Sequence, residues 1–201
     1  MSERWTHIFF DIGGVLGTNG WDGQQRAAAR QRFGLEAEFE DRHAEVAGDW
    51  ETGLLDLDEY LDCTVFYRPR EFTREAFITF MKSQSVPDAE VLALVHRIGA
   101  AGGSTLMTMN NEAEFLNLHR IETFGLRELF SAFLSSCWLG TRKPARRFFE
   151  HGLAIAQADP ARSIFVDDRE QNLTPARALG MTVVHFTGTT ALAEALRGMG
   201  L

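Results

Sequence analysis

The chain has 201 residues, of which 45% are hydrophobic, and a formal net charge of -8 at pH 7. This length fits one domain with an insertion, and no apolar run approaches the roughly 18 residues of a membrane-spanning helix. The negative charge, without any lysine- or arginine-rich run, argues against a nucleic-acid partner. Residues 1–6 lack the apolar segment of a secretory signal, which favours a cytoplasmic location.

The cysteines indicate neither a disulfide framework nor a zinc site. Cys63 and Cys137 are far apart, and neither belongs to a Cys-x-x-Cys or Cys/His group. We expect two free thiols in a protein that binds neither a membrane nor nucleic acid.

The first element is a short strand that ends on an acid. Residues 8–10 are β-branched or aromatic, which is typical of a strand covered on both faces of a parallel sheet. Asp11 follows, and Gly13 and Gly14 allow a sharp turn and a close approach of the backbone to a ligand. Ligands of open α/β sheets bind beyond the carboxyl ends of strands, so Asp11 is a candidate nucleophile or metal ligand. Capping of a turn is the alternative.

The segment that follows carries almost no strand signal. Apolar residues at helical spacing predict helices over residues 24–33, 36–50, 56–66 and 73–83. We interpret this segment as a helical-bundle cap inserted over the carboxyl end of the first strand. The chain is then divided into a core of residues 1–17 and 84–201 and a cap of residues 18–83.

Strands and helices alternate from residue 87 onward. Strands are predicted over 104–108, 132–134, 163–166 and 182–186, and helices over 88–98, 112–124, 144–156, 175–179 and 190–197. Pro144 is expected at the favoured first position of its helix. Strands separated by helices predict the α/β class, with a doubly wound parallel sheet and right-handed crossovers.

Polar residues stand at the predicted strand ends. They are Asp11 after the first strand, Thr108 on the second, Lys143 after the third, and Asp167 with Asp168 after the fourth. The carboxyl ends of parallel strands share one edge, where such groups can hold Mg²⁺ and a phosphate together. We therefore predict that Asp11 attacks phosphorus and forms an aspartyl-phosphate. Mg²⁺ and Lys143 would neutralise charge, and Thr108 would donate to a phosphate oxygen.

Four motifs in this order resemble those of the haloacid dehalogenase-like hydrolases. They are Asp-Ile-Gly-Gly-Val at 11–15, Leu-Met-Thr at 106–108, Lys-Pro at 143–144 and Phe-Val-Asp-Asp-Arg-Glu-Gln-Asn at 165–172. The resemblance covers essentially the whole chain and implies a Rossmann-like core with an inserted cap. It also implies Asp11 as the nucleophile, Thr108 and Lys143 on the phosphate, and Mg²⁺ bound by Asp11, the Gly13 carbonyl and Asp168, with Asp167 nearby.

Residues 11–16 and 50–53 further resemble the small sugar-phosphate phosphatases of this family, including those that act on glucose 1-phosphate. The implied partner is a small phosphorylated metabolite. At the second motif, Met109 stands where the family often has asparagine, so the candidate phosphate donors there are backbone N–H groups of Met109 and Asn110.

A second departure concerns acid–base catalysis. Most phosphatases of the family carry an aspartate two residues after the nucleophile, which protonates the leaving group and then activates water, but Gly13 occupies this position. General acid–base catalysis typically contributes about 10²–10⁴-fold. Candidate replacements from the cap are His43, Asp49 and Glu51, and a leaving group that needs little protonation is a further possibility.

Two other functions stay open. In a 2-haloacid dehalogenase the same aspartate attacks carbon without a metal, and the adjacent acids Asp167 and Asp168 argue against that reaction. A binding or regulatory protein that lost turnover with Gly13 is the other alternative. Considered alone, Lys143 would be an exposed lysine and Thr108 a turn residue, and Asn172 is expected to order its loop.

Overall fold

The computed structural model describes residues 5–201. Residues 1–4, which belong to the segment interpreted as lacking an export signal, lie outside this range. Among residues 5–201, no helix is both long enough and apolar enough to cross a membrane.

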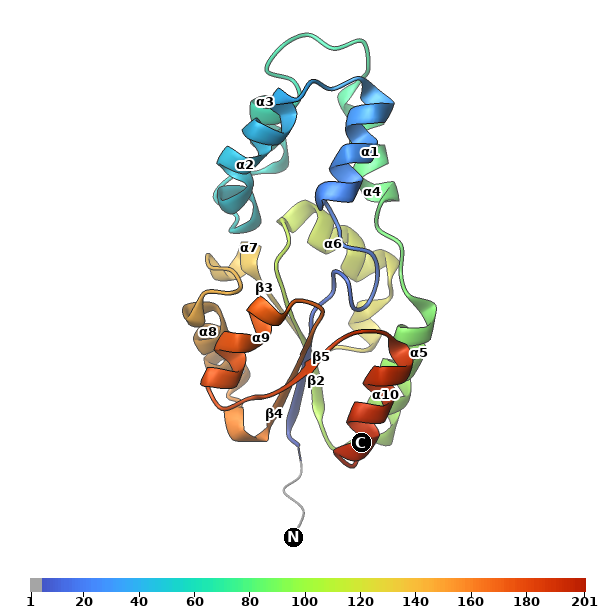
Figure 1. The fold of residues 1–201 in the computed structure, drawn as a ribbon, viewed down its shortest axis with the longest axis vertical. Helices are drawn as coiled ribbons and strands as arrows, with labels where there is room; N and C mark the ends of the chain where they lie inside the picture. Colours follow the sequence, from blue (N-terminus) through green and yellow to red (C-terminus); the bar gives the residue numbers. More distant parts are fainter. Residues whose placement is uncertain (1–4) are drawn as a thin grey trace.

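A five-stranded parallel sheet forms the centre of the described chain (Figure 1). Its strand order is β3-β2-β1-β4-β5. The strands are β1 (His7–Phe10), β2 (Thr105–Asn110), β3 (Ala132–Ser135), β4 (Ser163–Asp167) and β5 (Thr182–His185). The α/β class with a parallel sheet is thereby confirmed.

Helices cover both faces of the sheet, because alternate residues of each strand point to opposite sides. Ile8 and Phe10 pack against α5 (Ala89–Ala101), α6 (Glu114–Thr123) and α10 (Thr189–Gly198) on one side. Phe9 packs against α8 (Arg146–Ala156) and α9 (Glu170–Ala178) on the other. β1 is therefore buried on both faces, and its carboxyl end is fixed in space.

Four helices lie between β1 and α5 in the chain. They are α1 (Gly23–Phe33), α2 (Glu38–Glu51), α3 (Leu57–Thr64) and α4 (Arg74–Ser83), and we call them the four-helix segment. Local signals set their ends: Asp22 caps the start of α1, Gly34 ends it in the left-handed conformation, and Asp56 with Glu59 forms a capping box on α3. Most apolar side chains of this segment form one cluster, which also includes Ala113 and Leu116 at the start of α6.

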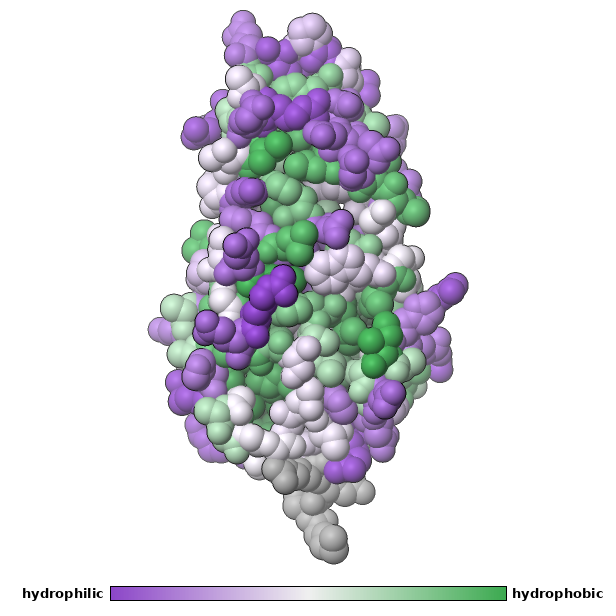
Figure 2. Space-filling view, turned by 180° about the vertical axis from the view of Figure 1, so that it is seen from behind, coloured by the Kyte–Doolittle hydropathy of each residue, from purple (hydrophilic) through white to green (hydrophobic). Residues whose placement is uncertain are grey.

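The four-helix segment lies beyond the carboxyl ends of the strands (Figure 1). The two chain crossings that lead to it are hydrogen-bonded to each other, from Thr18 N to Val86 O and from Asp88 N to Leu16 O, both at 2.9 Å. Arg120 of α6 donates to the Thr18 carbonyl and to the Ser85 hydroxyl, so it holds both crossings. From the opposite side, hydrophilic side chains cover the outer end of the segment (Figure 2).

Some elements differ from the sequence prediction. The helix expected from Pro144 begins at Arg146, and Pro144 stands in a turn after a cis peptide bond. A short helix, α7 (Ser136–Leu139), follows β3 without having been predicted. β2 extends two residues beyond the predicted end at 108, which changes the placement of the second motif.

Candidate active site

Asp11 lies directly after β1, at the carboxyl edge of the sheet. Its backbone N–H donates to the Val166 carbonyl at 2.9 Å, so the neighbouring strand β4 fixes its position. The Oδ1 atom of Asp11 accepts hydrogen bonds from Ile12 N at 2.8 Å and from Lys143 Nζ at 2.9 Å. Burial raises the pKa of Asp11 to about 7, although the Lys143 ammonium opposes this effect.

Lys143 lies between two carboxylates. Its Nζ atom is 2.9 Å from Asp11 Oδ1 and 2.6 Å from Asp167 Oδ2. Burial disfavours the charge, but Asp11 and Asp167 together raise the pKa of Lys143, so the ammonium keeps its proton. Asn111 fixes the lysine backbone, because its side chain accepts from Lys143 N and donates to Lys143 O, both at 2.9 Å.

Three carboxylates meet at this edge. Asp11, Asp167 and Asp168 each offer an oxygen within 4.8 Å of the others. Asp167 is already bonded to the Arg169 N–H, to Asn172 and to Lys143. Asp168 Oδ1, in contrast, is buried without a hydrogen-bond partner among the described residues.

The backbone at Gly14 leaves room for this group of acids. Gly14 has φ +76°, and a Cβ built on it would lie 2.3 Å from Asp168 Oδ2. Burial, reinforced by Asp167, raises the pKa of Asp168. Clustered carboxylate oxygens, one of them without a partner, fit the hard-oxygen preference of Mg²⁺.

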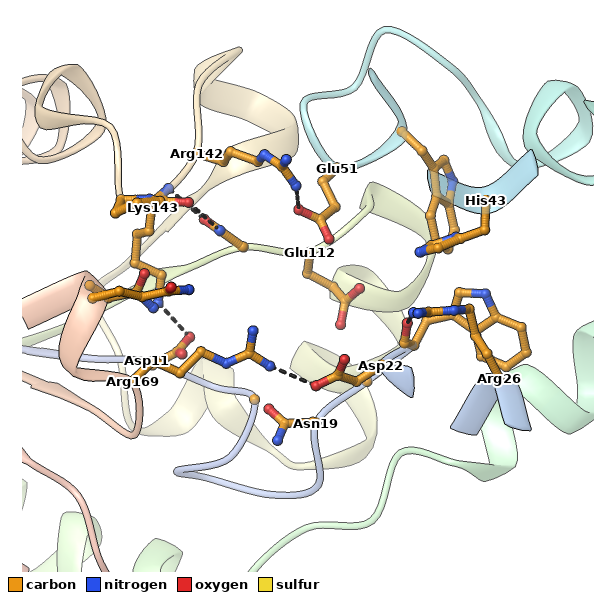
Figure 3. Close-up of a pocket in the computed structure, with 18 residues that line it drawn as sticks. Asp11, Asn19, Asp22, Arg26, His43, Glu51, Glu112, Arg142, Lys143 and Arg169 are labelled. Atoms are coloured by element: carbon orange, nitrogen blue, oxygen red, sulfur yellow. Dashed lines mark hydrogen bonds and ion pairs between the residues drawn. The ribbon is translucent and has the colours of Figure 1, made fainter. Parts of the chain in front are cut away.

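A cavity of about 250 Å³ opens at Asp11, which is one of its lining residues (Figure 3). Its walls come from both parts of the fold. The sheet side contributes Asp11, Gly13, Asn111, Glu112, Arg142, Lys143, Pro144, Arg169, Gln171 and Asn172; the connecting loop and the four-helix segment contribute Asn19, Gly20, Trp21, Asp22, Arg26, His43, Trp50 and Glu51.

Two ion pairs bridge these walls. Arg142 Nη1 lies 2.6 Å from Oε2 of Glu51 on α2. Arg169 Nη2 lies 2.6 Å from Oδ2 of Asp22 at the start of α1. Both pairs are partly exposed and contribute little to stability, about 0–1 kcal/mol. They do keep polar groups of both parts directed into the cavity (Figure 3).

His43 of α2 closes the far side of the cavity. Tyr60 of α3 accepts a hydrogen bond from Trp21 Nε1 at 2.8 Å, and its hydroxyl lies 2.9 Å from His43 Nδ1. Burial, with a contribution from Arg26, lowers the pKa of His43 to about 4. The ring is therefore neutral at pH 7, with Nδ1 paired to the Tyr60 hydroxyl.

The second motif is placed differently from the prediction. Thr108 lies inside β2, paired in register with Phe10 and Phe133, and its side chain is fully buried outside the cavity lining. The Met109 side chain packs in the core, and Asn110 is bonded to Ser135 and Asn117. Asn111 is the first residue after β2 and the first of this stretch to line the cavity.

The sequence reasoning missed several cavity residues. The sequence places Glu112 only at the start of a predicted helix and assigns no role to Arg142 or Arg169. Arg142 and Arg169 stand directly beside the predicted site residues Lys143 and Asp168. Glu112 lies four residues after the second motif, and a strand end placed at residue 110 would have brought it into consideration. Of the cap acids considered, Glu51 lines the cavity, whereas Asp49 is exposed outside its lining.

The fold is that of a known class of enzymes. The profile of the haloacid dehalogenase-like hydrolases matches residues 5–180. The chain belongs to this family of hydrolases, as the four motifs implied.

Relatives of known identity agree with this assignment. Sesquiterpene phosphatase astK of Aspergillus oryzae is 32% identical over 112 residues, which cover 55% of this chain and 56% of that protein. Flavin mononucleotide hydrolase 1 of Arabidopsis thaliana is 27% identical over 163 residues, 81% of this chain and 65% of that protein. The chain thus spans less than two thirds of the length of either relative.

A solved structure shares the fold. The haloacid dehalogenase family enzyme bt-2542 of Bacteroides thetaiotaomicron superposes with a TM-score of 0.79 at 18% identity, over 90% of this chain and 93% of that one. The same enzyme has been solved as a magnesium complex. At this identity the likeness establishes the common fold.

Proposed function

We propose that this chain is a magnesium-dependent phosphatase of small phosphate monoesters that acts through an aspartyl-phosphate on Asp11. The observation that carries the proposal is the meeting of Asp11 and Lys143 on the wall of a polar cavity, with a carboxylate oxygen of Asp168 within 4.8 Å of one of Asp11. A carboxylate nucleophile, a fixed ammonium and a set of oxygen ligands are the parts that phosphoryl transfer needs. Attack on carbon by a dehalogenase has no use for the third carboxylate.

The covalent chemistry divides into two steps. An oxygen of Asp11 attacks phosphorus, and the bond to the ester oxygen breaks, so that this oxygen leaves with the electron pair and takes up a proton. Water then attacks the phosphorus of the aspartyl-phosphate, loses a proton, and frees inorganic phosphate and the Asp11 carboxylate. Through both steps the Lys143 ammonium, held in place by Asp167, neutralises charge on the transferring group.

The metal would be held by this chain's oxygen atoms. Asp11, Asp168 and the Gly13 carbonyl are its proposed ligands, and the unpartnered Oδ1 of Asp168 supports that assignment. When bound, Mg²⁺ supplies positive charge beside the phosphoryl oxygens. Asp167 is proposed to position Lys143, since its oxygens are taken by the bonds to the lysine and Asn172.

The cavity favours a small hydroxylated substrate, such as a sugar phosphate. Arg26, Arg142 and Arg169 line a volume of about 250 Å³ together with several acids. A sugar can exchange hydrogen bonds with these groups, whereas an apolar chain would leave them desolvated and unpaired. The relative from Aspergillus oryzae is a sesquiterpene phosphatase. Because the cavity of this chain is lined by charged groups, we propose a different substrate class for it.

We further propose that residues 18–83 act as a cap on a core of residues 1–17 and 84–201. The two adjacent chain crossings support this division, as does a hydrophobic cluster that comes mostly from the four helices and includes only Ala113, Leu116 and the partly buried Phe115 from the core. Because His43 and Glu51 of the proposed cap line the cavity, the cap would select the leaving group.

The proposal is tested with p-nitrophenyl phosphate and a panel of phosphorylated metabolites, with and without Mg²⁺. We expect release of phosphate that depends on the metal and is abolished in Asp11→Asn. The matched control is Asp41→Asn, an exposed acid of α2, which should keep the wild-type rate. Release that persists in Asp11→Asn would contradict the nucleophile, and no release with any metal would favour a binding protein.

A further inference from the structure

We propose that Glu112 is the general acid and base that replaces the aspartate missing at position 13. This inference rests on the proposed phosphatase function and concerns the same cavity. Glu112 lies between the end of β2 and the start of α6. Its side chain points into the middle of the cavity, with Asp11 on one side and His43 on the other (Figure 3).

Arg120 connects Glu112 with the position of the missing carboxylate. Its Nη1 atom lies 3.6 Å from Glu112 Oε2 and 3.5 Å from the point where a Cβ on Gly13 would stand. An aspartate at position 13 would therefore reach the guanidinium that now faces Glu112. Gly20 leaves the space for the glutamate, because a Cβ there would lie 2.2 Å from Glu112 Oε2.

The surroundings of Glu112 suit a group that exchanges a proton near neutral pH. Its side chain is almost fully buried, and this burial raises its pKa to about 7. Arg120 of α6 opposes the shift, while Glu51 of α2 and Asp22 at the start of α1 add to it. General acids and bases are most effective when their pKa lies near the working pH.

The candidates from the four-helix segment fit less well. His43 is neutral at pH 7, and its Nδ1 atom is bonded to the Tyr60 hydroxyl. The Glu51 carboxylate forms an ion pair with Arg142 at 2.6 Å. Asp49 is exposed outside the cavity lining.

Glu112 would act in both covalent steps. In the first, the protonated carboxyl gives its proton to the ester oxygen as the bond to phosphorus breaks, so the alcohol leaves neutral. In the second, the Glu112 carboxylate takes a proton from the water that attacks the aspartyl-phosphate. Inorganic phosphate leaves, and Glu112 is protonated again for the next substrate.

The test uses Glu112→Gln with p-nitrophenyl phosphate. Because p-nitrophenolate leaves without a proton, the first step should stay fast, whereas hydrolysis of the aspartyl-phosphate loses its base. We expect a burst of about one p-nitrophenolate per chain, then a steady rate lowered by about 10²–10⁴-fold. Acid quenching should trap the phosphorylated chain for mass spectrometry. Glu122→Gln, which makes the same change at an exposed site of α6, should show neither effect.

A second variant asks whether a carboxylate at position 13 can take over. Gly13 tolerates a side chain, since the nearest atoms to an added Cβ are 3.4 and 3.5 Å away. Gly13→Asp combined with Glu112→Gln should remove the burst and raise the steady rate at least about tenfold. If Glu112→Gln does not fold, Glu112→Asp is measured in its place. We then expect a burst and a smaller loss of the steady rate than in Glu112→Gln.

The outcomes separate the two proposals. A wild-type chain that releases no p-nitrophenolate contradicts the phosphatase function itself. Wild-type turnover in Glu112→Gln, or a slower rate without a burst, leaves the phosphatase function standing and overturns the role of Glu112. Wild-type kinetics in Glu112→Asp would overturn it in the same way if that variant carries the test.

Discussion

Lys143 is a buried charge held by two buried partners. Replacing it by methionine leaves Asp11 and Asp167 close together without a cation, and loss of one member of a buried ionic group typically costs about 3–5 kcal/mol. We expect Lys143→Met to lower the free energy of unfolding by this amount at neutral pH, measured by urea titration. Lys82→Met, at a half-buried lysine of α4, should cost below about 1 kcal/mol.

A partial recovery distinguishes charge from packing at Lys143. Asp167→Asn in the Lys143→Met background removes one of the uncompensated charges, so it should restore some of the lost stability. A double variant as unstable as Lys143→Met would attribute the loss to packing alone.

Glu112 should also make stability depend on pH. Its folded pKa of about 7 exceeds the ordinary glutamate value of 4.5, so between these values the folded chain binds more protons than the unfolded chain. The contribution of Glu112 to the free energy of unfolding is fully present below the unfolded pKa. It is lost as the pH rises toward 7, at up to about 1.4 kcal/mol per pH unit.

The measurement compares two pH profiles. The free energy of unfolding of Glu112→Gln, minus that of the wild type, should increase from pH 4.5 to 7 and then stay level. Subtraction removes the shared contributions of Asp11 and Asp168. A difference that is independent of pH would show that Glu112 keeps an ordinary pKa.

At the residue scale, the sequence predicted the acids and the lysine for a clear reason. Asp11 and Asp167 each follow a strongly apolar run, and parallel strands bring such positions to one edge. Lys143 is predicted instead from the Lys-Pro motif after the third strand. The sequence predicts Thr108 at a strand end because polar and apolar residues mix after residue 107, which leaves the true end of β2 at Asn110 unmarked. The close approach of Glu112 and Arg120 depends on packing between α6 and the crossing chains, which no local pattern encodes.

Among the elements, the end of α2 makes a close backbone contact with α7 of the core. Gly53 follows α2 with φ +77°, and a Cβ on it would lie 2.3 Å from the Cys137 carbonyl oxygen of α7. Beside this contact, the hydroxyl of Ser136, the residue before Cys137, donates to the carbonyl of Glu51 at the end of α2 at 2.6 Å. This contact keeps the cavity residues of α2 in place against the sheet.

Gly53→Ala should therefore cost more than backbone strain alone. We expect a loss of about 2–4 kcal/mol, from the left-handed conformation and from overpacking against α7. Gly34→Ala is the matched control, because φ is +61° and no atom lies within 4 Å of an added Cβ. Urea unfolding of both variants gives the comparison, and equal losses would mean that α7 moves aside freely.

Helix and strand types were predictable where capping or periodicity is strong, as at Asp56 on α3. The ends of helices and strands that are set by tertiary contacts could not be predicted. Pro144 stands outside its helix because Lys143, directly before it, is held by Asn111 and the buried acids. The short α7 has four residues, which is too few for a periodic pattern.

For the whole molecule, the cavity exists only because the two hydrophobic clusters on the faces of the sheet and the cluster of the four-helix segment are held in one arrangement. The core places the nucleophile and the cationic groups, and the four-helix segment supplies the opposite wall. Arg120 joins both crossings of the chain and also faces Glu112. The position of the proposed acid is thereby coupled to the position of the four helices.

Binding of Mg²⁺ should stabilise the entire fold, because the proposed ligands join the ends of β1 and β4. A ligand that binds only the folded chain adds about 2.7 kcal/mol at a hundred times its Kd. For a chain of this size that corresponds to an increase of several degrees in the unfolding midpoint. Circular dichroism melts in EDTA and in millimolar Mg²⁺ measure the shift without any substrate. Asp168→Asn should abolish the shift, and Asp41→Asn should retain it. An unchanged shift in Asp168→Asn would place the ion elsewhere on the molecule.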